Sequence, residues 1–324
     1  MHIFIFFQLM IFLVPLHGFT DFTFRNVYQR HYSGIDMAIS PFIPLIQGEK
    51  GVIRKAKDVC PEWNKMPVIP QLLGNDSTLF VLAAKVLANW GYEKLNWNLG
   101  CPVNGICRKK RGSGLLPFPE LIRDILEKTL PNIEQQLSVK IRLGYKSENE
   151  INELIPVLND FPLEYIIVHP RIATQMYDGN VRHAVLSKCL PLFKHEIIYN
   201  GDISSLSDFK NIKQLHPTIK KWMIGRGIFS NPELPELIKN NNLLSVKNAN
   251  EHFLTFILDY YDEVYKLKNN EVLTINKIKD LWKYISIRFT NSTEIFGIIS
   301  HLNSLKSIKE STIEIITNYP LKLN

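Results

Sequence analysis

The sequence predicts an α/β protein: a (β/α)8 barrel of the TIM type, followed by a small all-helical C-terminal domain. Short runs rich in β-branched and aromatic residues alternate with helix-like stretches over about 220 residues. Few of these runs alternate polar with apolar residues, which is typical of parallel strands buried on both faces. Beyond residue 240 the pattern changes to amphipathic helices. We therefore assign residues 1–240 to the barrel and residues 241–324 to the helical domain.

Eight strands are expected, and most of them end in Gly, Pro, Asn or a charged residue. They cover residues 11–16, 35–40, 67–73, 94–100, 138–144, 165–171, 196–202 and 221–227. The clearest helices between them are 76–91, with an Asp/Ser cap and a terminal glycine, and 119–136. The C-terminal helices are expected at 248–267, 275–289 and 307–319. No GxGxxG motif follows a strand, which disfavours a doubly wound dinucleotide-binding sheet.

The composition is that of an ordinary globular enzyme, with 45% hydrophobic and 21% charged residues. The net charge of +7 is compatible with a polyanionic partner but does not identify one. Four cysteines lie at irregular spacing without a CxxC pair, so neither a zinc ribbon nor thioredoxin-like chemistry is expected. We expect reduced thiols in a cytoplasmic, monomeric protein.

The amino-terminal residues 1–14 are nearly all apolar, and a signal peptide is one interpretation. The segment lacks a basic start and a small-x-small cleavage site, and it is too short to span a bilayer. We therefore interpret residues 10–15 as a buried first strand, assign no role to residues 1–9, and expect no contact with a membrane.

Polar side chains stand at the ends of most expected strands. They are Gln71, Asn98, Cys101, Lys140, Arg142, His169, Arg171, Asn200, Asp202 and Arg226. The carboxyl ends of barrel strands meet on one face, where the active sites of such barrels lie. So complete a ring indicates a bound cofactor rather than a structural arrangement.

A phosphate site is expected after the last two strands. Gly225 and Gly227 let backbone amides approach a ligand, and Arg226 between them can form paired hydrogen bonds to phosphate. The segment 199–203 adds a second glycine loop, whereas a plain glycine turn is the alternative. Lys140 could stabilise negative charge on a reduced flavin ring, and Gln71 or His169 could bind its edge.

Cys101 directly follows a strand, in a turn flanked by Gly and Pro, before a loop that holds the basic residues 108–111. Its thiol could be a nucleophile, a metal ligand, a general acid or an inert packing group. No metal site is expected, because the next cysteine is six residues away and no histidine cluster accompanies it. A cysteine hydrolase would need a base and an oxyanion hole, whereas proton donation needs only a well-placed thiol.

Eight motifs in order, one near each expected strand end, resemble those of the tRNA-dihydrouridine synthase family. They are residues 15–25, 70–76, 96–102, 111–116, 138–144, 168–171, 199–203 and 223–227. The resemblance runs from about Phe12 to Lys239 and more loosely through the helical tail.

The resemblance implies that NADPH reduces FMN, that the flavin N5 passes a hydride to C6 of a flipped-out uridine in tRNA, and that Cys101 donates a proton to C5. Asn98, Arg142 and Arg171 would face the uracil. The implied FMN contacts are Pro15, Leu16, His17, Gln71, Lys140, His169, Asn200, Gly201, Asp202, Gly225 and Arg226.

The tRNA backbone needs a basic surface. Lys277, Lys279 and Lys283 on one helix are the first candidates, and the basic residues 108–111 are the second. A uridine of the D-loop is the expected target. The sequence does not give its position, nor a preference between NADPH and NADH.

Two other functions compete with this prediction. One is a flavin barrel that reduces a free pyrimidine or another small enone, similar to dihydroorotate dehydrogenase. The other is an inactive barrel that only binds tRNA.

Overall fold

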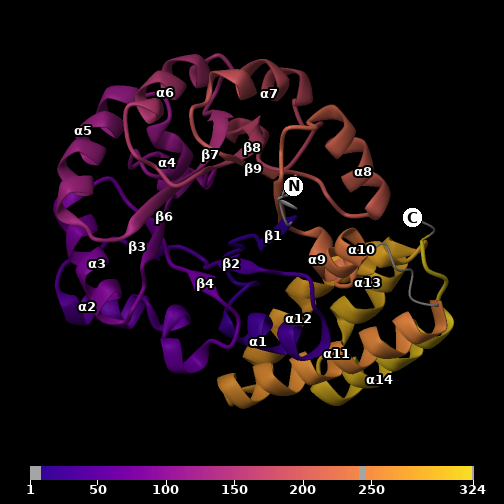
Figure 1. The fold of residues 1–324 in the computed structure, drawn as a ribbon. Helices are drawn as coiled ribbons and strands as arrows, with labels where there is room; N and C mark the ends of the chain where they lie inside the picture. Colours follow the sequence, from indigo (N-terminus) through magenta and orange to yellow (C-terminus); the bar gives the residue numbers. More distant parts are fainter. Residues whose placement is uncertain (1–8, 241–245, 323–324) are drawn as a thin grey trace, which may run out of the picture.

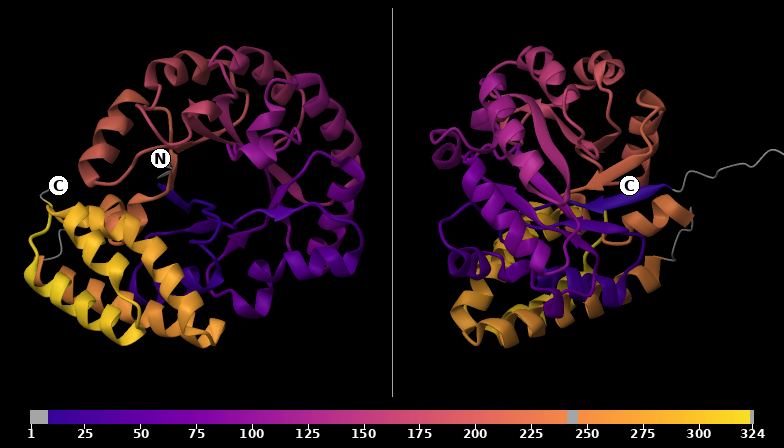
Figure 2. Two further views of the ribbon diagram at one scale, coloured as in Figure 1. Left: turned by 180° about the vertical axis from the view of Figure 1, so that it is seen from behind. Right: turned by 60° about the vertical axis from the view of Figure 1, so that its left-hand side comes forward.

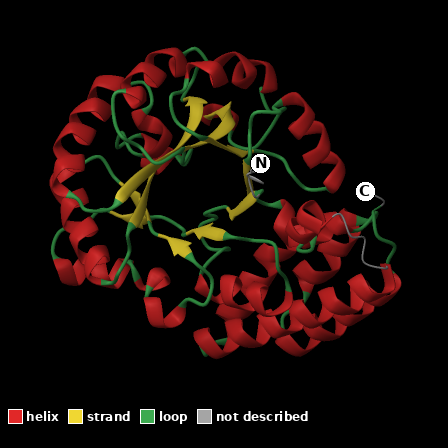
Figure 3. Cartoon of the chain, in the orientation of Figure 1, coloured by secondary structure: helices red, strands yellow, loops and turns green. Residues whose placement is uncertain are grey.

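A computed structural model describes residues 9–240 and 246–322 of the chain. Ten strands form one parallel sheet in the order β3-β5-β6-β7-β8-β9-β10-β1-β2-β4. The strands enclose a central space and the helices surround them, as the cartoon shows (Figure 3). The predicted barrel with helices after it is therefore confirmed.

All eight expected strand segments contain strand. The strands are β1 Met10–Leu13, β2 Met37–Ile39, β3 Ile43–Pro44, β4 Val68–Ile69, β5 Gln71–Leu73, β6 Lys94–Leu99, β7 Gln136–Gly144, β8 Ile166–Ile172, β9 Ile197–Asn200 and β10 Lys221–Ile224.

Ten strands occupy eight barrel positions because two segments are interrupted. Pro70 separates β4 from β5, since proline has no N–H to donate to a ladder. Pro41 lies in the break between β2 and β3. In register, β2 pairs with β4 and β3 pairs with β5. The two ends of the sheet thus meet along one stretch of chain, which closes the barrel. The short β3 was not predicted.

Helices surround the barrel (Figure 1). They are α1 Phe22–His31, α2 Glu49–Lys55, α3 Ser77–Asn89, α4 Asn104–Cys107, α5 Pro119–Thr129, α6 Glu150–Asn159, α7 His183–Cys189, α8 Leu206–Leu215, α9 Gly227–Ser230 and α10 Leu234–Asn240. The four-residue helices α4 and α9 lie in the loops that follow β6 and β10. The Asp76 carboxylate caps α3 by accepting a hydrogen bond from Leu79 N at 2.9 Å. The helix expected at 119–136 ends at Thr129, because a 3-10 turn containing Pro131 follows it.

Two apolar cores hold the barrel. The larger one lies between the strands and the surrounding helices. The smaller one fills the interior with side chains from alternate strand positions. It consists of Phe12, Val14, Ile39, Ile69, Tyr165, Ile167, Ile198 and Met223. The barrel is therefore closed by packing below the carboxyl ends of its strands.

Four further helices lie together beside α1 and α9 (Figures 1 and 2). They are α11 Val246–Lys268, α12 Glu271–Ile285, α13 Ser292–His301 and α14 Leu305–Asn318. Three of them match expected helices, and α13 was not predicted. The ring of Phe24 in α1 lies 6.1 Å from Phe256 and 5.9 Å from Tyr260 in α11. The boundary expected after residue 240 adjoins residues outside the described ranges and stays a prediction.

The expected strand at the amino terminus exists as β1, between β10 and β2. Residues 1–8 lie outside the description. In the ranges that it does cover, no helix combines the length and the apolar character needed to cross a membrane.

Candidate functional site

Strand register brings the predicted polar residues together at the carboxyl ends of β6 to β10. Asn98 in β6 is opposite Lys140 in β7, and Arg142 in β7 is opposite His169 in β8. Asn200 in β9 is opposite Met223 in β10, just before the Gly225–Arg226 turn. Side chains that are far apart in the sequence thus share one face of the barrel.

A chain of buried amides supports Cys101. The Asn98 amide donates to Gln71 Oε1 at 2.7 Å, and the Gln71 amide donates to Asn96 Oδ1 at 2.7 Å. Asn96 in turn donates to Ser138 Oγ at 2.9 Å. The Oδ1 of Asn98 accepts from Cys101 N at 2.9 Å, which fixes the turn after β6. Gln71 is fully buried, so its side chain reaches the site through Asn98.

Sequence reasoning missed Asn96 and Ser138. A signal was present, since residues 96 and 98 of one strand point to the same face and both are Asn.

The thiol of Cys101 is half-buried, and burial raises its pKa above the ordinary value. It is therefore protonated at neutral pH, which suits a proton donor better than a nucleophile. Its carbonyl accepts from Ser113 N at 3.0 Å and from Ser113 Oγ at 2.8 Å. Gly112 has φ +56°, and a Cβ there would lie 2.8 Å from the same carbonyl. The loop of residues 108–116 is thus packed against the Cys101 backbone.

Three basic side chains, Lys140, Arg142 and His169, are buried at the ends of the neighbouring strands β7 and β8. Burial lowers the pKa of Lys140 to about 7, with a further contribution from the charge of Arg142. Burial likewise lowers the pKa of Arg142 to about 10. His169 is 7% exposed, and burial and then the charge of Arg142 hold its pKa well below the ordinary value. Within residues 9–240 and 246–322 no carboxylate forms an ion pair with Lys140. These side chains thus favour a ligand that carries or develops negative charge.

The predicted phosphate end contains Asp202 as well as Arg226. Arg226 Nη2 lies 3.3 Å from Asp202 Oδ1, and Arg171 forms a second ion pair with the same carboxylate. The pKa of Asp202 lies below its ordinary value. Burial alone would raise this pKa, but the hydrogen bond and the charge of Arg171 outweigh the effect of burial. A Cβ on Gly225 would meet only Val14, at 3.6 Å, so the turn is open to a ligand.

The remaining predicted cofactor contacts lie at the same end of the barrel. Asn200 donates to Met223 O at 3.1 Å and so supports β10. Pro15, Leu16 and His17 form the loop after β1, where the His17 ring stacks on Phe42 with centroids 5.0 Å apart. Gly201 follows β9 directly, before Asp202.

Tyr177 is a site residue that sequence reasoning missed. Its ring lies 5.4 Å from the Arg142 guanidinium and 4.8 Å from that of Arg226, and it stacks near His169. It is 41% exposed. The preceding residue, Met176, has φ +52°, which is uncommon outside glycine and turns Tyr177 over the site. A Met-Tyr pair in a loop gives no sequence signal for this geometry.

The three lysines proposed to bind tRNA differ in their contacts and exposure. Lys277 forms an ion pair with Asp21, and its side chain is only 14% exposed. Lys279 contacts Asn303 at 3.5 Å, and Lys283 pairs with Asp280 at 2.6 Å on the exposed surface. Only Lys279 and Lys283 are therefore available to an external phosphate.

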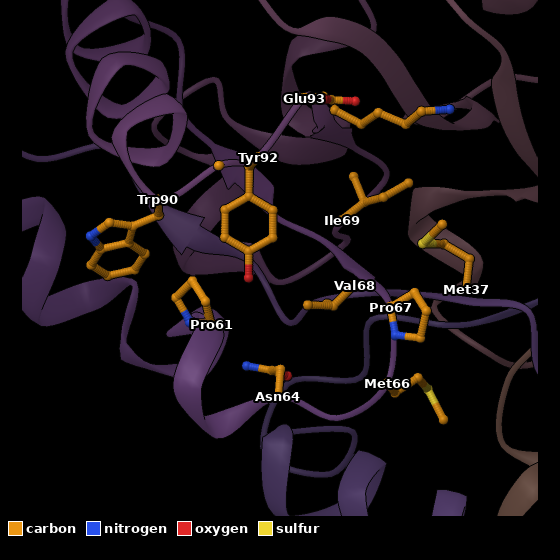
Figure 4. Close-up of a pocket in the computed structure, with 12 residues that line it drawn as sticks. Met37, Pro61, Asn64, Met66, Pro67, Val68, Ile69, Trp90, Tyr92 and Glu93 are labelled. Carbon is orange, nitrogen blue, oxygen red and sulfur yellow. The ribbon is translucent and has the colours of Figure 1, made fainter.

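A pocket of about 400 Å³ lies at the amino ends of β2, β4 and β6 (Figure 4), whereas Cys101 follows the carboxyl end of β6. Met37, Met66, Trp90 and Tyr92 line the pocket together with two prolines. It contains none of the predicted site residues. The described part of the chain also has no cluster of three His, Cys, Asp or Glu side chains suited to a metal ion.

The chain has the fold of the (β/α)8-barrel enzymes, a class whose active sites lie at the carboxyl ends of the strands, where these polar side chains gather. The family model described as dihydrouridine synthase matches residues 12–312. The chain belongs to the dihydrouridine synthase family, whose members are flavin-dependent oxidoreductases. The resemblance found in the sequence motifs is thereby confirmed.

Curated relatives match over most of the chain. "tRNA-dihydrouridine synthase B" of Pasteurella multocida is 27% identical over 263 residues, which cover 79% of this chain and 77% of the relative. "tRNA-dihydrouridine(16) synthase" of Vibrio parahaemolyticus is 24% identical over 311 residues, covering 92% and 94%. Among solved structures, an old yellow enzyme homologue from Zymomonas mobilis has 12% identity and a TM-score of 0.49, covering 72% of this chain and 89% of that one.

Proposed function

We propose that this protein is a tRNA-dihydrouridine synthase that reduces the C5–C6 bond of a tRNA uridine with FMN. Family membership and the names of the relatives support the reaction and the RNA substrate. The observation that carries the proposal for this chain is the position of Cys101, whose backbone N–H is held by Asn98 at the same strand ends as Lys140, Arg142 and His169.

The residues at the site fit a flavin mononucleotide. Lys140 is a buried amine without a carboxylate partner among the described residues, which suits a ring that gains negative charge on reduction. The open turn at Gly225 and the partly exposed Arg226 suit a phosphate. The loop at Pro15, Leu16 and His17, with Asn200 and Gly201, would form the rest of the cradle, and Gln71 would act through Asn98.

In this proposal the bound flavin supplies the hydride that is added at C6 of the uracil. The Cys101 thiol would donate its proton to C5 of the uracil. Its raised pKa keeps the thiol protonated at neutral pH until then. Arg142 donates hydrogen bonds from Nε to Gly100 O at 3.1 Å and from Nη1 to Ile172 O at 3.0 Å. Arg142 would then bind a uracil carbonyl beside Asn98, with the Tyr177 ring next to its guanidinium.

Two basic surfaces would bind the tRNA backbone. Arg108, Lys109 and Lys110 are exposed on the loop that packs against Cys101. On α12, Lys283 is exposed and Lys279 is half-buried beside Asn303. We further propose NADPH as the reductant, a D-loop uridine as the target, a cytoplasmic location and a monomeric state.

The direct test uses purified protein, FMN and NADPH with an unmodified tRNA transcript. Mass spectrometry should detect dihydrouridine in the tRNA, whereas free uridine and free uracil should stay unreduced. A colourless protein that takes up no FMN would contradict the proposal. Reduction of free uracil without action on tRNA would favour the small-substrate flavin barrel, and tRNA binding without any reduction would favour the inactive barrel.

A further inference from the structure

Both terminal nitrogens of Arg171 form hydrogen bonds inside the protein, whereas its buried Nε has no hydrogen-bond partner among the described residues. The residue is 2% exposed at the end of β8. Nη1 lies 3.0 Å from Asp202 Oδ1 and 3.2 Å from His169 Nε2. Nη2 donates to Gly179 O at 2.7 Å and to the second oxygen of Asp202. These contacts use all four hydrogens of the two terminal nitrogens, so none of these hydrogens remains for a uracil.

The contact with His169 has only one chemically possible direction. A guanidinium donates hydrogen bonds and cannot accept them. The Nε2 of His169 must therefore accept, which places the single proton of a neutral imidazole on Nδ1. An imidazolium would direct an N–H at the guanidinium, and the lowered pKa of His169 agrees with its being neutral.

The second ring nitrogen is left for a ligand. No hydrogen bond to Nδ1 of His169 is formed by any residue that the structure describes. Because Nε2 faces Arg171, a molecule in the site meets the Nδ1 side of the ring. That side carries a hydrogen-bond donor.

We propose that Arg171 is a positioning residue, which fixes His169 as the neutral Nδ1–H tautomer so that the histidine donates a hydrogen bond to the flavin. This inference rests on the proposed function. It replaces the expected contact of Arg171 with uracil by an indirect role, exerted through His169.

Asp202 connects this arrangement to the phosphate end. The same carboxylate accepts from both terminal nitrogens of Arg171 and from Arg226 Nη2 at 3.3 Å. A carboxylate in direct contact with a phosphate would repel it. Asp202 therefore acts by orienting two arginines, one toward His169 and one toward the phosphate.

The test is the tautomer of His169 in the flavin-loaded protein, labelled with ¹⁵N-histidine. Long-range ¹H–¹⁵N correlation spectra distinguish Nδ1–H from Nε2–H, and His169→Gln identifies the signal by its loss. The wild type should show Nδ1–H at neutral pH. Arg171→Met should convert His169 partly or wholly to Nε2–H and weaken FMN binding about tenfold.

Arg182→Met is the matched control. Arg182 lies near the same loop and pairs with Glu148, but it makes no contact with His169. Its replacement should leave the tautomer and the FMN affinity unchanged.

Nε2–H in the wild type would overturn the inference, as would an Arg171→Met protein that keeps pure Nδ1–H. If Arg171→Met does not fold, the wild-type spectrum alone decides. A protein that binds no FMN would refute the proposed function instead, and the tautomer would still be readable without flavin.

Discussion

Asn98 connects the chain of buried amides to the turn that carries Cys101. Its amide nitrogen is anchored by Gln71, and its oxygen accepts from the backbone N–H of Cys101. The position of Cys101 therefore depends on a hydrogen-bonded chain that begins at Ser138, in the neighbouring strand β7. At this scale each side chain has a separable task, and substitutions can distinguish them.

Cys101→Ala should bind FMN and tRNA as the wild type does but form dihydrouridine at least a hundredfold more slowly, because the proton donor is lost. Single-turnover formation of dihydrouridine, measured by mass spectrometry, tests this. Cys107→Ala is the control, since Cys107 is buried and the hydrogen bonds of its sulfur involve the Cys101 carbonyl and Ser113 Oγ but not the Cys101 thiol. An equal loss in both variants would assign a structural role to the loop.

Lys140→Met should stabilise the flavin-free protein while it abolishes most FMN binding. Burial lowers the pKa of Lys140 from 10.5 to about 7, so burying this amine costs stability. The cost is complete below pH 7 and disappears as the pH rises toward 10.5. Urea unfolding at pH 7 should therefore show a gain on the order of 2 kcal/mol, which shrinks by pH 10. A variant less stable than the wild type at pH 7 would contradict this.

At the scale of elements, the loop of residues 108–116 carries exposed basic side chains and also packs against the backbone of Cys101, the proposed proton donor. Ser113 and Gly112 press against the Cys101 carbonyl, while Lys110 lies 4.2 Å from the ring of Phe118. An RNA phosphate bound by this loop would lie next to the reactive thiol.

Gly112→Ala should therefore impair catalysis without loss of flavin. Its φ of +56° is strained for alanine, and the new Cβ would lie 2.8 Å from Cys101 O, so the turn must shift. We expect at least a tenfold fall in dihydrouridine formation with unchanged FMN absorbance. Gly105→Ala, in the short helix α4 just before this loop, is the control, because a Cβ there meets nothing within 4 Å. Similar rates in the two variants would show that the loop does not position Cys101.

At the scale of the whole molecule, we predict two different roles for the lysines of α12, because Lys277 is paired with Asp21 whereas Lys279 and Lys283 are not. Lys279→Ala with Lys283→Ala should weaken tRNA binding and lower the slope of log affinity against log salt by about one unit per lost contact. Lys277→Ala should leave that slope unchanged and lower the melting temperature, because the ion pair with Asp21 joins α12 to the start of α1. Filter-binding titrations at several salt concentrations measure the slopes. An unchanged slope in the double variant would direct attention to Lys109 and Lys110.

The barrel could be predicted because its strands are buried on both faces and so appear as continuous apolar runs. The same reasoning located Lys140, Arg142 and His169, since parallel strands bring their carboxyl ends together. It could not find β3, which has two residues, nor the turn that carries Tyr177, which depends on a rare backbone conformation at Met176. It also placed Lys277 on an exposed surface, because sequence periodicity does not reveal a partner 256 residues away.

The aromatic contact between α1 and α11 bears on how such an enzyme can be divided. Phe24 lies against Phe256 and Tyr260, and one continuous apolar cluster includes residues from the barrel and from the last helices. A cut after α10 would expose these rings on both fragments. The terminal helices therefore cannot be exchanged alone. A chimera that replaces them must also replace the residues of α1 that contact α11.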